Sequence, residues 1–467
     1  MKKNITKITI AAVLLFTGAL HMQAQNKEPR TFSGRNPKTG VVRCATVEYG
    51  SYLEEGNTEL AAKNANFENW ISQKIEERKL QRNGATTNEV ITIPVVVHVI
   101  HNGDAVGSGE NILDGQVISQ ITVLNQDFRR MAGTPGENSE EVGADTQIEF
   151  CLAQVKPDGT AFNGIDRVDM GQTNWATFDD VNLNLKPATI WDPEQYFNIW
   201  VVRFSTSNSA ELNGILGYAQ FPEGSTLNGV PTDPQATAAS DGVVIGYRYF
   251  GSSVEFPEGD YATSLGYDRG RTTTHEVGHA LGLRHIWGDG GSQSLGTSNC
   301  NATDYCNDTP YAKWDNWDCN AAYDTCPTKA GADMTNNYMD YTNDACMNIF
   351  TQDQMTRMHT VLENAQRRAS LVTSVVCQPT AANPEFNLLQ GINLYPNPTQ
   401  GVLTIATQDS QLPDSYVIYN SLGQTIANVA VKGAANLTVD TSAYSNGVYF
   451  IKVDKGNATK TLKFIKN

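Results

Sequence analysis

The sequence has few basic residues and, beyond its first segment, no long apolar stretch. Its 34 lysines and arginines are outnumbered by 50 aspartates and glutamates, so the formal net charge is -16. This balance argues against a nucleic-acid-binding protein, because phosphate contacts require a basic surface. After residue 24 no stretch approaches the roughly 20 consecutive apolar residues that a transmembrane helix needs. We therefore expect no nucleic-acid partner and no transmembrane segment.

The one long apolar stretch lies at the start of the chain. Lysines at positions 2, 3 and 7 precede an apolar run from Ile8 to Leu20. This order predicts a secretory signal peptide over residues 1–24, with cleavage after Ala24. The mature protein would then be exported, and its 8 cysteines could form disulfides. A chain of 467 residues also predicts two or three folded units.

Histidine is scarce, with 7 residues in the chain, yet three of them lie close together in HEVGHALGLRH, residues 275–285. On a helix, His275 and His279 lie about 40° apart around the axis, so both imidazoles can reach one ion. Gly282 allows a turn with positive φ that brings His285 round as a third ligand. Three imidazoles leave one position open on a tetrahedral zinc, which is typical of a catalytic site. Glu276 projects beside them as a candidate general base.

Two functions are compatible with such a site. The first is a zinc-dependent endopeptidase, in which a zinc-activated water attacks the peptide bond and Glu276 takes its proton. The second is a non-enzymatic secreted adhesin whose fold is stabilised by a metal. The adhesin hypothesis predicts loss of the base or of a ligand, and the sequence retains all of them. We therefore favour the endopeptidase, with proteins or peptides as its substrates.

Residues 25–88 are polar and contain one helical pattern, from Leu60 to Leu80. Within them Cys44 stands alone, far upstream of the histidines. It is either a small buried hydrophobic residue or a thiolate that occupies the open zinc position and keeps a precursor inactive. We favour the thiolate and interpret residues 25–88 as an inhibitory propeptide. The basic stretch from Arg78 to Arg82 is a natural place to cut it.

Residues 89–377 are expected to form an α/β catalytic domain. β-Branched and apolar stretches predict strands, and apolar residues at helical spacing predict helices laid on the sheet. The expected strands cover residues 91–100, 147–155, 197–204 and 242–250, and the expected helices cover residues 111–131, 272–283 and 351–371. His98 and His101 lie on the first strand without ligand spacing, and we interpret them as structural.

The stretch after His285 is rich in Gly, Asn, Asp and Cys as far as residue 346. This composition favours loops held by cross-links over regular structure. Within it, Asp304, Asp308 and Thr309 supply hard oxygens that could hold Ca²⁺. A solvated turn without an ion fits the same spacing equally well.

The C-terminal part of the chain differs in pattern. Residues 378–390 contain two prolines and are expected to form a linker. Residues 391–467 contain short alternating stretches separated by turn residues, which predict an antiparallel β-sandwich. A carbohydrate-binding or adhesive sandwich would share this pattern.

Residues 90–373 resemble the pappalysin family of metzincin zinc endopeptidases. The resemblance rests on the eleven-residue histidine motif, on NYMDY at residues 337–341, on the cysteine-rich insert, on Asp304 to Pro310, and on Phe350, Thr351, Gln354, Arg357 and Met358. It implies a metzincin fold, which is an α+β catalytic domain with a twisted sheet, an active-site helix and an irregular lower subdomain held by disulfides.

The resemblance also implies roles for individual residues. By this resemblance His275, His279 and His285 bind the zinc, and Glu276 is the general base. Met339 forms the apolar floor under the zinc, and Tyr341 places a hydroxyl near the metal. Arg43 and Cys44 look like the family's cysteine switch. In this clan the segment that contains Asp344 walls the pocket for the residue after the cut. A carboxylate there would favour Arg or Lys after the cut, since such pairing is charge-assisted. The alternative is that Asp344 is a solvated surface residue.

Two further implications concern cross-links and export. The cysteine pattern suggests bridges from Cys300 to Cys326 and from Cys319 to Cys346, and a bridge between Cys151 and Cys377 would leave Cys306 unpaired. Residues from Asn393 to Asn467 resemble the C-terminal sorting domain of type IX secretion cargo. That resemblance implies the type IX machinery as a partner. It also implies a protein that is secreted or attached to the cell surface after export through the periplasm.

Overall fold

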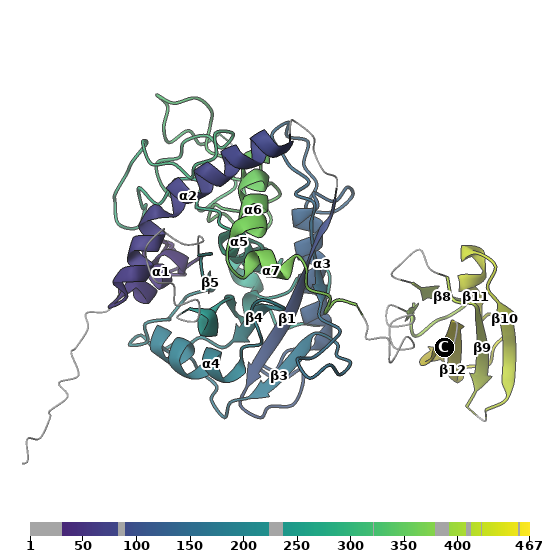
Figure 1. The fold of residues 1–467 in the computed structure, drawn as a ribbon. Coiled ribbons are helices and arrows are strands. Elements are labelled where there is room, and N and C mark those ends of the chain that lie inside the picture. Colours follow the sequence, from purple (N-terminus) through teal and green to yellow (C-terminus); the bar gives the residue numbers. More distant parts are fainter. Residues whose placement is uncertain are drawn as a thin grey trace, which may run out of the picture. The chain divides into compact units, whose positions relative to one another are not determined.

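The structure is a computed structural model, which describes residues 30–82, 89–223, 237–320, 322–378, 392–407, 412–421, 423–455 and 458–467 (Figure 1). The chain divides into two units, residues 1–31 and residues 32–467. The predicted signal peptide, and all of the predicted linker except Gln378, lie outside the described residues. In the described part, no helix combines the length and the apolar character that a membrane crossing requires.

The N-terminal segment forms two helices, α1 (Thr46–Glu54) and α2 (Thr58–Arg82). The pattern from Leu60 to Leu80 predicted α2, whereas α1 was not predicted, because its sequence TVEYGSYLE has no clear helical period. Helix α2 packs on helix α6 (Gln352–Asn364) through Phe67 and Ile71. The segment is therefore folded against the rest of the unit.

The first sheet has six strands in the order β2-β1-β4-β6-β5, with β3 paired to β1. Its strands are β1 (Ile91–His101), β2 (Ile148–Leu152), β3 (Ile165–Asp169), β4 (Phe197–Val202), β5 (Gly217–Ala219) and β6 (Val243–Gly246). All pairs are parallel except β5 with β6. The prediction missed β3 and β5, and its last strand was too long, since a 3-10 helix (Tyr247–Tyr249) follows β6. The antiparallel strand β5 forms one edge of the sheet.

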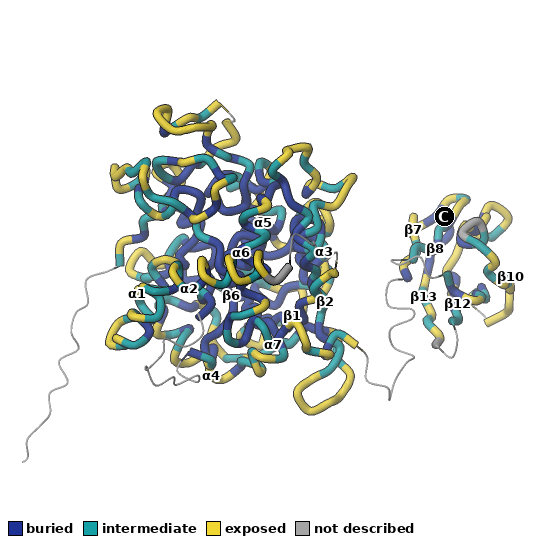
Figure 2. The backbone as a smooth tube through the Cα atoms, turned by 45° about the horizontal axis from the view of Figure 1, so that its top comes forward, coloured by how far each residue is buried: buried dark blue, intermediate teal, exposed yellow. Residues whose placement is uncertain are grey.

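Side chains alternate between two cores, one on each face of this sheet. On one face Val97, Ile199 and Ile245 pack with helices α3 (Asp114–Phe128) and α5 (Arg271–Ala280). On the other face the sheet packs with a π-helix (Asp180–Leu185), with helix α4 (Lys186–Thr189) beside it, and with α1. Burial on both faces explains the nearly continuous apolar sequence of β1 (Figure 2).

His98 fits the structural role that was expected for it. It is buried in β1, where its ring nitrogens contact Asp166 Oδ2 at 2.8 Å and Asn198 Oδ1 at 2.9 Å. The ring also stacks on Trp200.

Residues 281–351 are largely irregular, as expected, and contain two of the three disulfides. The bridges are Cys300–Cys326, Cys319–Cys346 and Cys151–Cys377, with Cys44 and Cys306 as free thiols. They match the pairs that the resemblance implied. Short 3-10 helices lie at Ala238–Ser240 and Thr263–Leu265.

The predicted helix over residues 351–371 is wrong as a single element. Helix α6 begins with a capping box formed by Thr351 and Gln354, and α7 (Arg368–Leu371) is separate. Between them Arg367 has φ +65°. Its guanidinium is held by ion pairs with Glu223 and Asp241, which stabilise this break in the helix.

The C-terminal part is an antiparallel sandwich of two sheets, as predicted. One sheet contains β7 (Asn393–Tyr395), β8 (Val402–Ala406) and β11 (Thr438–Asp440), and the other contains β9 (Ser415–Asn420), β10 (Thr425–Ala430), β12 (Gly447–Lys455) and β13 (Ala458–Lys466). A 3-10 helix (Ala434–Leu437) precedes β11. Leu403, Ile418 and Ile451 are among the residues that form its core.

Candidate metal centre

Three histidines meet at the end of helix α5. His275 and His279 lie one turn apart on α5, which ends at Ala280. Gly282 follows with φ +91°, a left-handed conformation that glycine adopts without strain, and the chain then returns with His285. The Nε2 atoms of the three rings are 3.0, 3.1 and 3.2 Å apart. The sequence motif therefore folds into one convergent set of nitrogens.

The other nitrogen of each ring has its own partner. Each Nδ1 is directed at an oxygen, which is Tyr338 O for His275 (2.7 Å), Leu283 O for His279 (2.8 Å) and Asp289 Oδ1 for His285. With Nδ1 protonated, each Nε2 presents a lone pair, and three lone pairs this close repel unless a cation lies between them. A tetrahedral zinc, with Zn–N bonds of about 2.0–2.1 Å, holds its nitrogens about 3.3 Å apart. The residues present fit such an ion.

Burial favours the uncharged form of the two rings on α5. It lowers the pKa of His275 and of His279 well below the ordinary value, and neighbouring histidines lower both further. Neutral imidazole is the form that binds a metal. Met339 packs against the same helix, and a Cβ at Gly278 would lie 2.6 Å from Met339 Sδ, so this contact requires glycine.

Cys44 of the N-terminal segment lies at the same point. Its Sγ and one nitrogen of each histidine all lie within 4.8 Å of one another, and Sγ is 3.4 Å from Glu276 Oε2. The Thr46 hydroxyl donates to the same Oε2 at 2.7 Å and accepts from the Ala219 backbone N–H at 2.8 Å. The N-terminal segment thus covers both the histidine nitrogens and one oxygen of Glu276.

The environment of Glu276 suits a group that exchanges protons. Its carboxyl is fully buried beside the histidines, and Oε1 has no hydrogen-bond partner among the described residues. Burial raises the pKa of Glu276 to about 7, against the lowering effect of the bonds from Thr46 and Cys44. A carboxyl with a pKa near neutrality can both take and return a proton at physiological pH.

Tyr341 stands beside the histidines. Its ring centroid is 4.8 Å from that of His285 and 5.7 Å from that of His275. The N-terminal segment passes directly over the hydroxyl, since a Cβ on Gly34 would lie 2.8 Å from the Tyr341 oxygen. Only a residue without a side chain fits there.

Comparison with known proteins assigns this arrangement to a family. Residues 251–363 match the peptidase family model described as pregnancy-associated plasma protein-A, and residues 393–467 match the model described as the secretion system C-terminal sorting domain. An extracellular metalloprotease of Verticillium alfalfae is 31% identical over 61% of this chain and 80% of its own length. Another, of Colletotrichum graminicola, is 32% identical over 61% of this chain and 81% of its own length. The chain belongs to the pappalysin family of metalloproteases.

Solved structures agree with this assignment. Mirolysin in complex with compound 9 is 36% identical, with a TM-score of 0.50 over 62% of this chain and 98% of that chain. A promirolysin mutant from Tannerella forsythia is 32% identical, with a TM-score of 0.55 over 71% of this chain and 97% of that chain. The protein is therefore an extracellular metalloprotease of metzincin fold, and its C-terminal part is a sorting domain for type IX secretion.

In this metalloprotease Asp344 is not a solvated surface residue. The side chains of Asp344 and Arg43 are both 0% exposed, and Arg43 Nη1 lies 2.8 Å from Asp344 Oδ1. Asp344 Oδ2 accepts from the backbone N–H of Arg269 at 2.9 Å and of Arg271 at 3.2 Å. The Arg43 guanidinium also lies over the Tyr267 ring, 4.6 Å from its centroid. Arg43, the residue next to Cys44, therefore occupies a buried site around Asp344 that binds its guanidinium group.

The three candidate calcium ligands have partners within the protein. Asp304 accepts from Thr309 Oγ1 at 2.8 Å and from the Cys306 N–H at 3.1 Å. Asp308 accepts from Thr351 Oγ1 at 2.7 Å and from the Asp353 N–H at 2.9 Å, at the start of α6. Burial raises the pKa of Asp304 to about 7. Calcium binding at this loop stays a prediction.

Three residues that support the centre were not predicted from the sequence. Thr46 and Asp289 had only weak sequence signals. Thr46 lies two residues after Cys44, and Asp289 lies four residues after His285. Glu68 of α2 had none, yet it makes two 2.7 Å bonds to Arg357 and one of 2.8 Å to Arg284. Arg357 also donates to the Gly282 carbonyl at 2.6 Å, so α2 is tied to the turn between the histidines.

Proposed function

We propose that this metalloprotease is a zinc-dependent endopeptidase made as a latent zymogen, with residues 25–88 as propeptide and residues 89–377 as catalytic domain. One observation carries the proposal. Three histidine nitrogens converge beside a buried carboxyl, and the Cys44 thiol lies where a fourth ligand would bind. A non-enzymatic adhesin would need neither the carboxyl nor the thiol.

Zinc on His275, His279 and His285 would lower the pKa of a water molecule toward 7 and polarise the peptide carbonyl. Glu276 would take the proton from the attacking water and later deliver it to the leaving amine. Tyr341 donates a hydrogen bond to the carbonyl oxygen as negative charge develops on it. Met339 supports the helix that carries the ligands, and the Nδ1 partners of the histidines fix their rings.

The choice of metal can be tested without mutation. Native mass spectrometry is expected to find one zinc per chain in the zymogen. A chelator such as 1,10-phenanthroline should abolish peptide cleavage by the cut enzyme, and added zinc should restore it whereas magnesium should not, because imidazole nitrogens favour zinc. Full activity in metal-free protein would exclude the proposal.

Latency is proposed to rest on Cys44, whose thiolate is a strong zinc ligand. The promirolysin relative supports a precursor form, since its name denotes a pro-enzyme. Thr46 adds a second block by holding Glu276 Oε2. Removal of the propeptide would free both groups together.

Substitution of the thiol gives the corresponding prediction. The uncut Cys44→Ala zymogen is expected to cleave a quenched fluorescent peptide at least about 10-fold faster than the uncut wild type, because more of the metal site is open. Electrophoresis at each time point would confirm that the chain is still uncut. Cys306→Ala is the matched control, since Cys306 is the other buried free thiol among the described residues, and it should stay latent. Equal latency in both variants would exclude Cys44 as the block.

We also propose that Asp344 selects Arg or Lys after the cut. The support is the Arg43 guanidinium in the Asp344 site, buried and charge-paired. Such a preference allows the enzyme to cut its own propeptide before a basic residue. A cut before Arg78 requires unwinding of α2, where Arg78 Nε contacts both Glu363 oxygens at 3.0 and 3.1 Å. A cut before Arg82, the last residue of α2, requires less unwinding.

A further inference from the structure

Tyr49 of helix α1 fills a pocket built by the catalytic domain. The side chain is buried, and its ring centroid lies 5.3 Å from that of Phe178 and 4.6 Å from that of Tyr218. Its hydroxyl donates to Asn182 Oδ1 at 2.5 Å and accepts from Lys186 Nζ at 3.0 Å. The pocket therefore has aromatic walls and a polar end that matches a phenol.

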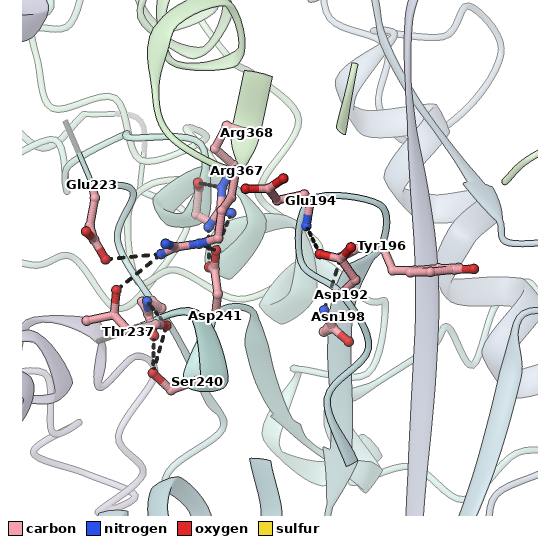
Figure 3. A network of polar contacts seen from close by, with 12 residues as sticks. Asp192, Glu194, Tyr196, Asn198, Glu223, Thr237, Ser240, Asp241, Arg367 and Arg368 are labelled. Atoms are coloured by element: carbon pink, nitrogen blue, oxygen red, sulfur yellow. Dashed lines mark hydrogen bonds and ion pairs between the residues drawn. The ribbon is translucent and has the colours of Figure 1, made fainter. Parts of the chain in front are cut away.

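The polar end is held by the catalytic domain without help from the propeptide. Lys186 Nζ donates also to the Ser240 carbonyl at 2.9 Å, and the Ser240 hydroxyl donates to Gln220 Oε1 at 2.7 Å. The next residue, Asp241, is fixed by buried ion pairs with Arg367 and Arg368 (Figure 3). Lys186 thus keeps one acceptor when Tyr49 leaves, and its position is set in advance.

Loss of Tyr49 would remove one hydrogen bond from each of two polar groups that line the pocket. Lys186, whose side chain is 0% exposed, and Asn182 would each lose a bond. The Tyr218 hydroxyl is buried and already has no hydrogen-bond partner among the described residues. Unpaired buried polar groups favour a ligand that supplies the missing hydroxyl, because each lost bond costs free energy.

The propeptide path shows on which side of the cut such a ligand would lie. Arg43 fills the Asp344 site, Cys44 lies at the histidines, and Ala45 then donates its N–H to the Gly217 carbonyl of β5 at 3.1 Å. Tyr49 follows on α1. If the Asp344 site takes the residue after the cut, the Tyr49 pocket takes one before it.

We propose that the pocket formed by Phe178, Asn182, Lys186 and Tyr218, here the tyrosine pocket, binds a tyrosine side chain of the substrate on the N-terminal side of the cut. The proposal rests on the proposed function, since Tyr49 must leave with the propeptide. In the zymogen Tyr49 occupies the pocket as a stand-in for that substrate residue. The mature enzyme would then select substrates with a basic residue after the cut and a tyrosine before it.

The test compares paired peptides with the cut, mature enzyme. Each pair has Arg after the cut and differs only by Tyr or Phe at one of the four positions before it. We expect kcat/KM to favour Tyr over Phe by about 10-fold at one position, since the site bonds the hydroxyl. Lys186→Met should bring the Tyr/Phe ratio close to one. Asn182→Ala, at a partly exposed residue, should lower the same ratio if Lys186→Met does not fold.

Each ratio is taken within one protein, so that a general loss of activity cancels. Equal rates for Tyr and Phe at all four positions, in an enzyme that cleaves the peptides, would overturn the tyrosine pocket and leave Tyr49 as an anchor of the propeptide. Failure to cleave any of the peptides, even with the propeptide removed and zinc present, would instead count against the proposed function.

Discussion

The Glu276→Ala enzyme, with its propeptide removed by an added protease, is expected to retain zinc and to lose peptide cleavage. We expect kcat/KM to fall by about 10³-fold, within the usual range for loss of a general base. The three histidines keep their Nδ1 partners in this variant, so the metal site should persist. Zinc content by mass spectrometry and cleavage of a quenched peptide are the two measurements.

The control for this prediction is a carboxylate of the catalytic domain that touches no histidine of the metal centre. Glu363 lies on α6 and pairs in the zymogen with Arg78 of α2, which the cut enzyme no longer contains. Once cut, the Glu363→Gln variant should therefore have wild-type kcat/KM. Cleavage by Glu276→Ala at a rate close to that of the control would exclude Glu276 as the base.

The spacing of the histidines was enough to predict their convergence, because helix geometry and a glycine turn fix it locally. His275, His279 and His285 lie within one short stretch, and no distant residue is needed to bring them together. Long apolar strands such as β1 were equally readable from the sequence. Local periodicity therefore predicted the metal centre and most of the sheet.

Features that depend on distant partners could not be predicted in this way. Thr46 reaches Glu276 only because the N-terminal segment bonds to β5, a strand too short to give a pattern. The break between α6 and α7 depends on the pairing of Arg367 with Glu223 and Asp241. In both cases the interaction that decides the structure joins residues more than a hundred positions apart.

The last prediction concerns the buried pair of Arg43 and Asp344. In the mature enzyme, Asp344→Asn should lower the kcat/KM ratio of Arg over Leu after the cut by about 10²-fold, since the charge-assisted bond to the substrate is lost. Profiling with a peptide library in which only that residue varies measures this ratio. An unchanged preference for Arg, or a preference of the wild type for an aliphatic residue, would rule out Asp344 as the selecting residue.

In the zymogen the same change leaves the Arg43 charge buried without its partner. We expect the free energy of unfolding to fall by about 3–5 kcal/mol, because a buried ion pair broken on one side leaves an uncompensated charge. The double variant Arg43→Leu with Asp344→Leu removes both charges and should recover most of that loss. Urea denaturation of the wild type, both single variants and the double variant gives the coupling energy of the pair. A coupling energy near zero would mean that the Arg43–Asp344 pair does not hold the propeptide in place. The pair would then give no measure of how strongly the Asp344 site binds a basic substrate residue.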